Sequence, residues 1–232
     1  MNCALIIDYS QYQFLDQPPF FIGVDHDATD VYSDITRKHL TLAPNVEYAI
    51  RHCGRGTKAI DLGANVGHFT LPLSNQGVSV LAVEALPVNY VLLCQSVAKN
   101  RFTNTIPVHA AIHSSPGVVS MSGTSAWAKV SQGTDGVLVP SMTFDDLCGT
   151  YNFWDASLVK IDIEGSELAA FHGAERFMRQ NTDAVFLFEA NAWATQGFNY
   201  PVCDLLDHLV ARGYSLYMFE GKNLVPRTAQ FY

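Results

Sequence analysis

The sequence lacks the paired cysteines that build disulfide frameworks and zinc knuckles. Its five cysteines are scattered, and Cys-x-x-Cys does not occur. A disulfide scaffold needs an even set of cysteines, and a zinc knuckle needs paired ligands. Both are therefore excluded, and a reducing cytoplasm is the expected compartment.

Long runs of one residue kind are also missing. No apolar run reaches the length of a membrane span, and Asp8 interrupts an N-terminus that has no basic region. We therefore expect no signal peptide and no membrane partner. The 14 Lys and Arg against 22 Asp and Glu give a net charge of −8, without any basic run. A nucleic-acid surface needs a clustered basic patch, so no nucleic-acid partner is expected.

Hydrophobic residues make up 48% of the 232 residues, which is enough for a sizeable core. Short buried runs alternate with stretches of helical spacing, which is typical of βα units with a parallel sheet. The loop at residues 220–223 is too short for a parallel crossover and makes the last strand antiparallel. We predict an α/β, Rossmann-like fold. Its seven-stranded sheet is mostly parallel, with the last strand antiparallel and helices on both faces, which is the arrangement of the class I methyltransferase fold.

The chain divides into two parts and an insertion. Residues 1–42 are read as a cap or lid, or alternatively as a structural appendage, and residues 43–232 as the main domain. Strands are expected at 105–112 and 158–163, and helices at 44–52, 87–99 (with Asn100 as C-terminal cap) and 166–179. Residues 114–146 lack helical spacing and predict a β-type insertion, in which 118–121 pairs with 137–139. Trp127 in this insertion lines the acceptor pocket or fills the core.

Residues 58–70 carry the strongest functional signal. A buried strand runs through the glycine turn GANVG into a helix, which gathers free backbone N–H groups at one point. Asn65 stands where a dinucleotide-binding turn needs its second glycine, and Asp61 would repel a pyrophosphate. An acid there suits a cationic amino-acid group. Glu84 ends the next strand, where a carboxylate can accept hydrogen bonds from both ribose hydroxyls.

A nucleoside without phosphates that carries an amino acid fits these features, and S-adenosylmethionine is such a ligand. A glycine turn without any ligand is the plainer alternative. Ala111 is small enough for adenine to lie flat beside it. The predicted cofactor-binding residues are Asp61, Gly63, Ala64, Asn65, Gly67, Thr70, Glu84, Ala85, Ala111 and Asp162.

Four motifs resemble the FkbM methyltransferase family. They are DLGANVGHFT at residues 61–70, VEALP at 83–87, VPSMTFDDL at 139–147 and LVKIDIEGSEL at 158–168. The KIDIEGxE run is specific to that family, although Ala85 replaces a proline that its members more often have. The resemblance covers residues 41–219. It implies methyl transfer from S-adenosylmethionine, usually to oxygen on a sugar, a polyketide or a related natural product.

The carboxyl ends of the strands should converge on the reaction site. A hydroxyl acceptor needs a base for its proton, and the candidate catalytic residues are Asp162, Glu164, Glu189 and His113. Carboxylates that share a site raise one another's pKa, as a base requires. Lys160 is expected to pair with a carboxylate, and Glu167 is expected to cap a helix rather than react.

No metal is expected at the site. The alternative is Mg²⁺ held by oxygen ligands of Asp162, Glu189 and Asn191, which would lower the pKa of a bound hydroxyl.

The expected activity is methyl transfer from S-adenosylmethionine to a hydroxyl oxygen of a small molecule or glycan. A homodimer is an assembly that the chain could form. One alternative is an N-methyltransferase acting on a small molecule. Another is a non-catalytic binding module, but such a module would be expected to lack the acids Asp61, Glu84, Asp162 and Glu164, which this sequence has. A nucleotide-sugar dehydrogenase or epimerase is disfavoured, because it would need glycine at position 65, where this sequence has Asn65. The run DIEG at residues 162–165 stands where an enzyme that methylates nucleic-acid bases would have an Asn-Pro-Pro-type motif, so methylation of nucleic acid is disfavoured.

Overall fold

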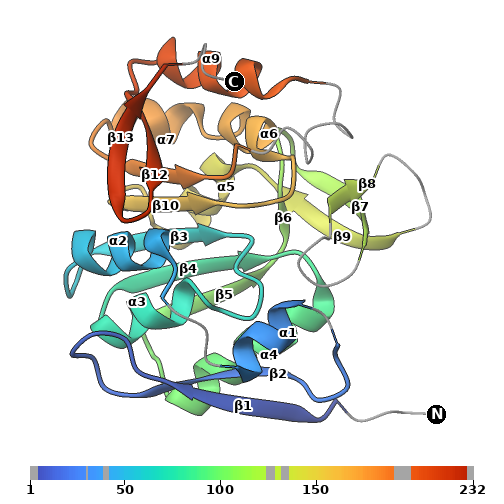
Figure 1. Cartoon of the computed structure of the whole chain (residues 1–232). Helices are drawn as coiled ribbons and strands as arrows, with labels where there is room; N and C mark the ends of the chain where they lie inside the picture. Colours follow the sequence, from blue (N-terminus) through green and yellow to red (C-terminus); the bar gives the residue numbers. More distant parts are fainter. Residues whose placement is uncertain are drawn as a thin grey trace.

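A computed structural model of the chain describes residues 5–29, 31–38, 42–123, 129–131, 136–190 and 200–228. At its centre lies a sheet of five parallel strands in the order β11-β10-β3-β4-β5 (Figure 1). They are β3 (Lys58–Leu62), β4 (Ser79–Glu84), β5 (Thr105–His109), β10 (Leu158–Ile161) and β11 (Val185–Phe188). The chain adds strands on one side of β3 and later returns to its other side with β10. Ligands bind at the carboxyl ends of the strands at such a reversal.

Different helices cover the two faces of the sheet. Side chains alternate along each strand, so Ala59 and Val80 join one buried cluster whereas Ile60 and Leu81 join another. The first cluster contains side chains of α2 (Pro44–His52), α3 (Thr70–Gln76) and α4 (Pro87–Asn100). The second contains side chains of α5 (Phe144–Tyr151), α6 (Glu167–His172), α7 (Glu175–Gln180) and α9 (Val202–Val210). The predicted α/β architecture with helices on both faces is confirmed.

The central sheet of the described residues has five strands, not the seven predicted. β12 (Leu216–Glu220) and β13 (Asn223–Arg227) pair with each other as an antiparallel hairpin that forms a separate sheet. This hairpin packs on α2, where the rings of Phe219 and Tyr48 lie 5.9 Å apart and Lys222 pairs with Glu47 at 2.8 Å. The hairpin thus has side-chain contacts with a helix instead of the expected place in the central sheet. An alternating pattern identifies a strand but does not say which neighbour it finds.

Two further predicted elements are divided. The strand expected at residues 105–112 breaks at Ala110, because β6 (Ala111–Ile112) leaves the central sheet to pair with β9 (Val137–Met142). The helix expected at 166–179 breaks into α6 and α7 at Gly173, where a Cβ would lie 2.8 Å from the carbonyl oxygen of His113. None of the described helices has the length and apolarity of a membrane span.

The insertion is a small four-stranded sheet in the order β6-β9-β7-β8. β7 (Gly117–Ser122) runs antiparallel to β9 and places Val119 opposite Val139, which confirms the predicted pairing. β8 (Lys129–Ser131) completes the sheet. Trp127 lies outside the described residues.

The N-terminal segment forms a hairpin and a helix: β1 (Ile7–Tyr12), β2 (Phe20–Asp25) and α1 (Val31–Arg37). The hairpin lies along α4, at the bottom of Figure 1. The Asn100 side chain accepts from the Phe21 N–H at 2.7 Å and donates to the Phe21 carbonyl at 2.6 Å. Asn100 is therefore not the C-terminal cap that we predicted. Arg101, with φ of 57°, takes that place.

Candidate active site

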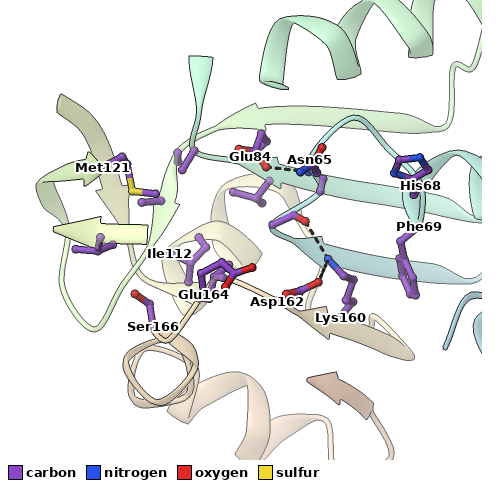
Figure 2. A pocket seen from close by; sticks show the side chains of 18 of the residues that line it. Asn65, His68, Phe69, Glu84, Ile112, Met121, Lys160, Asp162, Glu164 and Ser166 are labelled. Carbon is purple, nitrogen blue, oxygen red and sulfur yellow. Dashed lines mark hydrogen bonds and ion pairs between the residues drawn. The ribbon is translucent and has the colours of Figure 1, made fainter. Parts of the chain in front are cut away.

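A cavity of about 230 Å³ lies beyond the carboxyl ends of the central strands (Figure 2). Its wall is formed by the glycine turn, the ends of β4 and β10, the segment after β5 and the start of α2. The predicted cofactor-binding residues that line it are Gly63, Ala64, Asn65, Glu84, Ala85, Ala111 and Asp162.

The glycine turn brings the end of β3 against the end of β10. Gly63 has φ of 77°, and a Cβ there would lie 1.9 Å from the carbonyl oxygen of Asp162. Only glycine combines this left-handed backbone with so close an approach. Asn65 also has a positive φ, 50°, and its side-chain oxygen accepts from the Val66 N–H at 2.7 Å. Contacts within the chain thus fix the shape of the turn where it faces the cavity.

Glu84 is fixed by two backbone amides. One carboxylate oxygen accepts from the Asn65 N–H and the other from the Leu86 N–H, both at 2.8 Å. Burial raises the pKa of Glu84, and the two amide bonds oppose that shift. Each carboxylate oxygen has lone pairs beyond the one used by its amide. The carboxylate can therefore take two further donors side by side, as a ribose presents them.

Lys160 occupies the position behind the turn. Its Nζ lies 2.9 Å from the Gly63 carbonyl oxygen, 3.2 Å from Asp61 and 3.3 Å from Asp162. Burial lowers the pKa of Lys160, but Asp61 and Asp162 outweigh it, so the pKa lies above its ordinary value. The predicted pairing of Lys160 with a carboxylate is confirmed.

The partner of Lys160, Asp61, is fully buried and does not line the cavity. The Thr70 hydroxyl donates to Asp61 at 2.6 Å, and Thr70 and Gly67 also lie outside the cavity wall. We predicted that Asp61 would face a cationic group of the ligand. The structure places the cation of Lys160 there instead.

Three acids converge at the ends of β10 and β11. Asp162, Glu164 and Glu189 each offer a carboxylate oxygen, and these oxygens lie within 4.8 Å of one another. Asp162 and Glu164 line the cavity, whereas Glu189 is exposed beside it. Burial first, and then the charges of Glu189 and Asp162, raise the pKa of Glu164 to about 7. A carboxyl group with this pKa is poised to exchange a proton near neutral pH.

The turn that carries Glu164 is held from two sides. Glu164 has φ of 53°, an uncommon conformation for a residue with a side chain. Glu167 accepts from the Ile163 and Gly165 N–H groups at 3.1 and 3.2 Å, and Tyr200 donates to the Gly165 carbonyl at 2.6 Å. Glu167 therefore acts on backbone amides, as its predicted capping role implies, and does not line the cavity.

The β5 side of the cavity is apolar. Ala85, Ala111 and Ala110 line it together with Met121 and Val130 from the insertion. Met121 and Val130 pack with Leu86, Ala85 and Ala111 in a small cluster of their own. His113 does not line this wall, because β6 leaves the central sheet to pair with β9; the Nδ1 of His113 lies 3.3 Å from the Ser114 hydroxyl. Asn191 lies outside the described residues.

Residues 61–216 match the Methyltransferase FkbM domain. The chain belongs to the FkbM methyltransferase family. Members of this family use S-adenosylmethionine. The cavity of this FkbM methyltransferase has the Glu84 carboxylate on its wall and an apolar end.

The chain is also similar to solved structures of methyltransferases, but with low sequence identity and TM-scores below 0.5. Precorrin-6y C5,15-methyltransferase from Geobacter metallireducens is 12% identical, with a TM-score of 0.46 over 79% of this chain and 80% of that chain. A TehB-like SAM-dependent methyltransferase from Corynebacterium glutamicum is 14% identical, with a TM-score of 0.45 over 84% and 91%. The M. jannaschii TYW2 complex with AdoMet is 21% identical, with a TM-score of 0.31 over 44% of this chain and 43% of that chain. The FkbM methyltransferase thus spans less than half of the TYW2 chain. No curated protein matches it.

The cavity of the FkbM methyltransferase includes residues that the sequence did not point to. His68 lines it, and burial, followed by the charge of Lys160, lowers the pKa of His68 to about 4. Its Nε2 lies 2.8 Å from the hydroxyl of Thr36, which links the glycine motif to α1. Ser166 also lines the wall, and Tyr200 supports it from behind. No local sequence signal marks these contacts, because each joins segments far apart in the chain.

Proposed function

We propose that this FkbM methyltransferase transfers a methyl group from S-adenosylmethionine to a hydroxyl oxygen of a small molecule or glycan. The observation that carries the proposal is Glu164, a carboxyl group with a pKa of about 7 on the wall of the cofactor cavity. A hydroxyl is a poor nucleophile until its proton leaves, and a base of this pKa can take that proton at neutral pH.

The residues of the cavity set the direction in which the cofactor would lie. Glu84 would accept hydrogen bonds from the ribose hydroxyls. The apolar Ala85, Ala111 and Met121 on the β5 side would hold the adenine ring. Gly63 and Asp162 on the β10 side would hold the amino-acid end, so that the methyl group would lie near the acids at the end of β10.

Bound S-adenosylmethionine supplies an electrophilic methyl group on a sulfonium. Glu164 accepts the proton of the acceptor hydroxyl as the oxygen–carbon bond forms and the carbon–sulfur bond breaks. Burial of Glu164, and then the negative charges of Glu189 and Asp162, keep its pKa raised. The ammonium group of Lys160 balances the negative charges of Asp61 and Asp162, so that the glycine turn and the end of β10 stay aligned.

The charge of the site favours a neutral acceptor. Asp162, Glu164 and Glu189 stand together near the cavity mouth, and the chain carries a net charge of −8. Phosphate groups of a nucleic acid would be repelled there. A hydroxyl on a sugar ring or on an uncharged natural product meets no such penalty.

Mg²⁺ is a second candidate for activating the hydroxyl, and the observation that favours it is the same carboxylate triad. Asp162, Glu164 and Glu189 offer oxygen ligands, which Mg²⁺ prefers. A bound divalent ion would lower the pKa of a coordinated hydroxyl. Exhaustive treatment with EDTA separates the two, because a reaction that depends on Glu164 alone keeps its rate.

The first experiment is calorimetric titration of S-adenosylhomocysteine into the protein. Binding is expected for the wild type, and Glu84→Ala should weaken it by about 100-fold, since two charge-assisted hydrogen bonds are lost. The absence of heat and of any thermal shift in the wild type at high ligand concentration contradicts the proposal. A mass-spectrometric screen of extracts for a methyl gain then identifies the acceptor.

A further inference from the structure

Ser166 occupies the N-cap position of α6 without capping it. A serine there normally accepts from an amide of the first helical turn. The Ser166 side chain makes no such bond, and its hydroxyl has no hydrogen-bond partner among the described residues, although Ser166 is only 1% exposed. Buried hydroxyls without a partner are rare and costly, so a specific one calls for an explanation.

Other groups bind the amides of the first helical turn. The Leu168 N–H donates to the Tyr200 hydroxyl at 3.5 Å, and the Ala170 N–H donates to the backbone carbonyl of Ser166 at 3.0 Å. The Ser166 hydroxyl is therefore not needed for the helix. It lies instead on the wall of the cofactor cavity.

The surroundings of this hydroxyl point to the part of the ligand that it meets. Figure 2 shows Ser166 toward the end of the cavity where Ile112 and Met121 lie, away from His68 and Phe69. Ala111 and Val130 pack with Met121, and their side chains carry no hydrogen-bonding group. Glu164 lies beside Ser166 and Ile112 on the side that leads to Asp162 (Figure 2). A flat heteroaromatic ring fits between such apolar walls, and its polar edge needs a partner.

We infer that the Ser166 hydroxyl hydrogen-bonds the edge of the adenine ring of the bound cofactor and so contributes to cofactor specificity. The inference rests on the proposed cofactor orientation. A hydroxyl can donate to a ring nitrogen or accept from the exocyclic amino group. In either case ligand binding satisfies a group that the free protein leaves without a partner.

The test is calorimetric titration of the wild type and Ser166→Ala with S-adenosylhomocysteine and two analogues of it. One analogue lacks the 6-amino group, and the other carries carbon in place of ring nitrogen N1. Ser166→Ala should weaken binding of S-adenosylhomocysteine about tenfold. This loss should disappear with the analogue that lacks the atom bonded to Ser166. The melting temperature of the free protein should stay the same or rise, because no bond is lost there.

Ser120→Ala is the matched control. The Ser120 hydroxyl is also buried without a partner among the described residues, but it lies outside the cofactor cavity. Its removal should leave every affinity unchanged. The inference is overturned if Ser166→Ala binds S-adenosylhomocysteine as tightly as the wild type, loses affinity equally for all three ligands, or melts at a lower temperature without ligand. Failure of the wild type to bind S-adenosylhomocysteine removes the proposed function as well, so the two failures are distinguishable.

Discussion

The ammonium group of Lys160 lies 3.2 Å from Oδ1 of Asp61 and bridges it to Asp162 at 3.3 Å. Asp61 is fully buried, and its Oδ1 accepts no hydrogen bond from a described residue, so the ion pair is what compensates that oxygen. The same ammonium donates to the carbonyl of Gly63 at 2.9 Å. One side chain of β10 thus holds both the charge before the glycine turn and the backbone of the turn itself.

Lys160→Met should destabilise the fold strongly. It leaves the Asp61 carboxylate buried without its cation, and breaking a buried pair in this way costs about 3–5 kcal/mol. Urea unfolding measures the loss. The double variant with Asp61→Asn should recover part of it, because the uncompensated charge is removed. Lys38→Met is the control, since Lys38 and Asp34 form an exposed pair that contributes at most about 0.5 kcal/mol. A Lys160→Met protein as stable as this control contradicts the assigned role.

Glu164→Gln should change activity and stability in opposite directions. Loss of the base should lower kcat by about 10²–10⁴-fold without changing affinity for S-adenosylhomocysteine. In the wild type, kcat should rise with pH through the Glu164 pKa of about 7, because the carboxylate form is the base.

The stability effect follows from the same pKa, which is raised from an ordinary 4.5 to about 7. The folded state therefore binds this proton more tightly than the unfolded state, and wild-type stability falls as pH rises between these values. Glu164→Gln should melt at a higher temperature than the wild type at about pH 8 but not at about pH 4. Asp183→Asn, an exposed acid outside the cavity, should show neither effect. If Glu164→Gln and the wild type melt at the same temperature at about pH 8, the pKa of Glu164 is not raised.

Gly63→Ala should abolish cofactor binding. The added Cβ would lie 1.9 Å from the carbonyl oxygen of Asp162, and a residue with φ of 77° also pays about 1–2 kcal/mol in the left-handed region. β3 and β10 must then separate at the site. Thermal melting and calorimetry with S-adenosylhomocysteine measure the outcome. Gly54→Ala is the control, because a Cβ added at Gly54 would meet no atom within 4 Å. Normal binding by Gly63→Ala disproves the close approach.

The parts of the site that the sequence predicted are those carried by short segments. Gly63, Asn65 and Glu84 follow from a strand, a turn and the next strand, whose geometry is local. The pairing of Lys160 with a carboxylate could be predicted, because side chains alternate along a buried strand and Lys160 is at an inward-facing position. The glycine turn and residues 162–164 could be brought together because all parallel strands of one sheet end on one edge.

The features of the site that could not be predicted from the sequence depend on contacts between residues far apart in the chain. Nothing near Asp61 shows that Lys160, about a hundred positions later, supplies its cation. His113 follows a predicted strand, but that strand breaks at Ala110 and carries His113 away with the insertion. The C-terminal hairpin was placed in the sheet because strand patterns are local, whereas its packing on α2 depends on Tyr48 and Glu47. The Ser166 hydroxyl could not be singled out, since most serines at a helix start do cap.

Tyr200→Phe should loosen the turn that presents Glu164. The Tyr200 hydroxyl donates to the Gly165 carbonyl at 2.6 Å, and its removal should cost about 1–2 kcal/mol. With a looser turn, Glu164 can move away from Asp162 and Glu189, so its pKa should fall back toward 4.5. The rise of kcat with pH should therefore shift to lower pH and kcat should drop, while affinity for S-adenosylhomocysteine stays the same. Tyr217→Phe, at a side chain that is 58% exposed, should leave stability, kcat and the pH dependence of kcat unchanged. A Tyr200→Phe enzyme that loses stability but keeps the wild-type pH dependence would show that Tyr200 supports the fold without positioning the base.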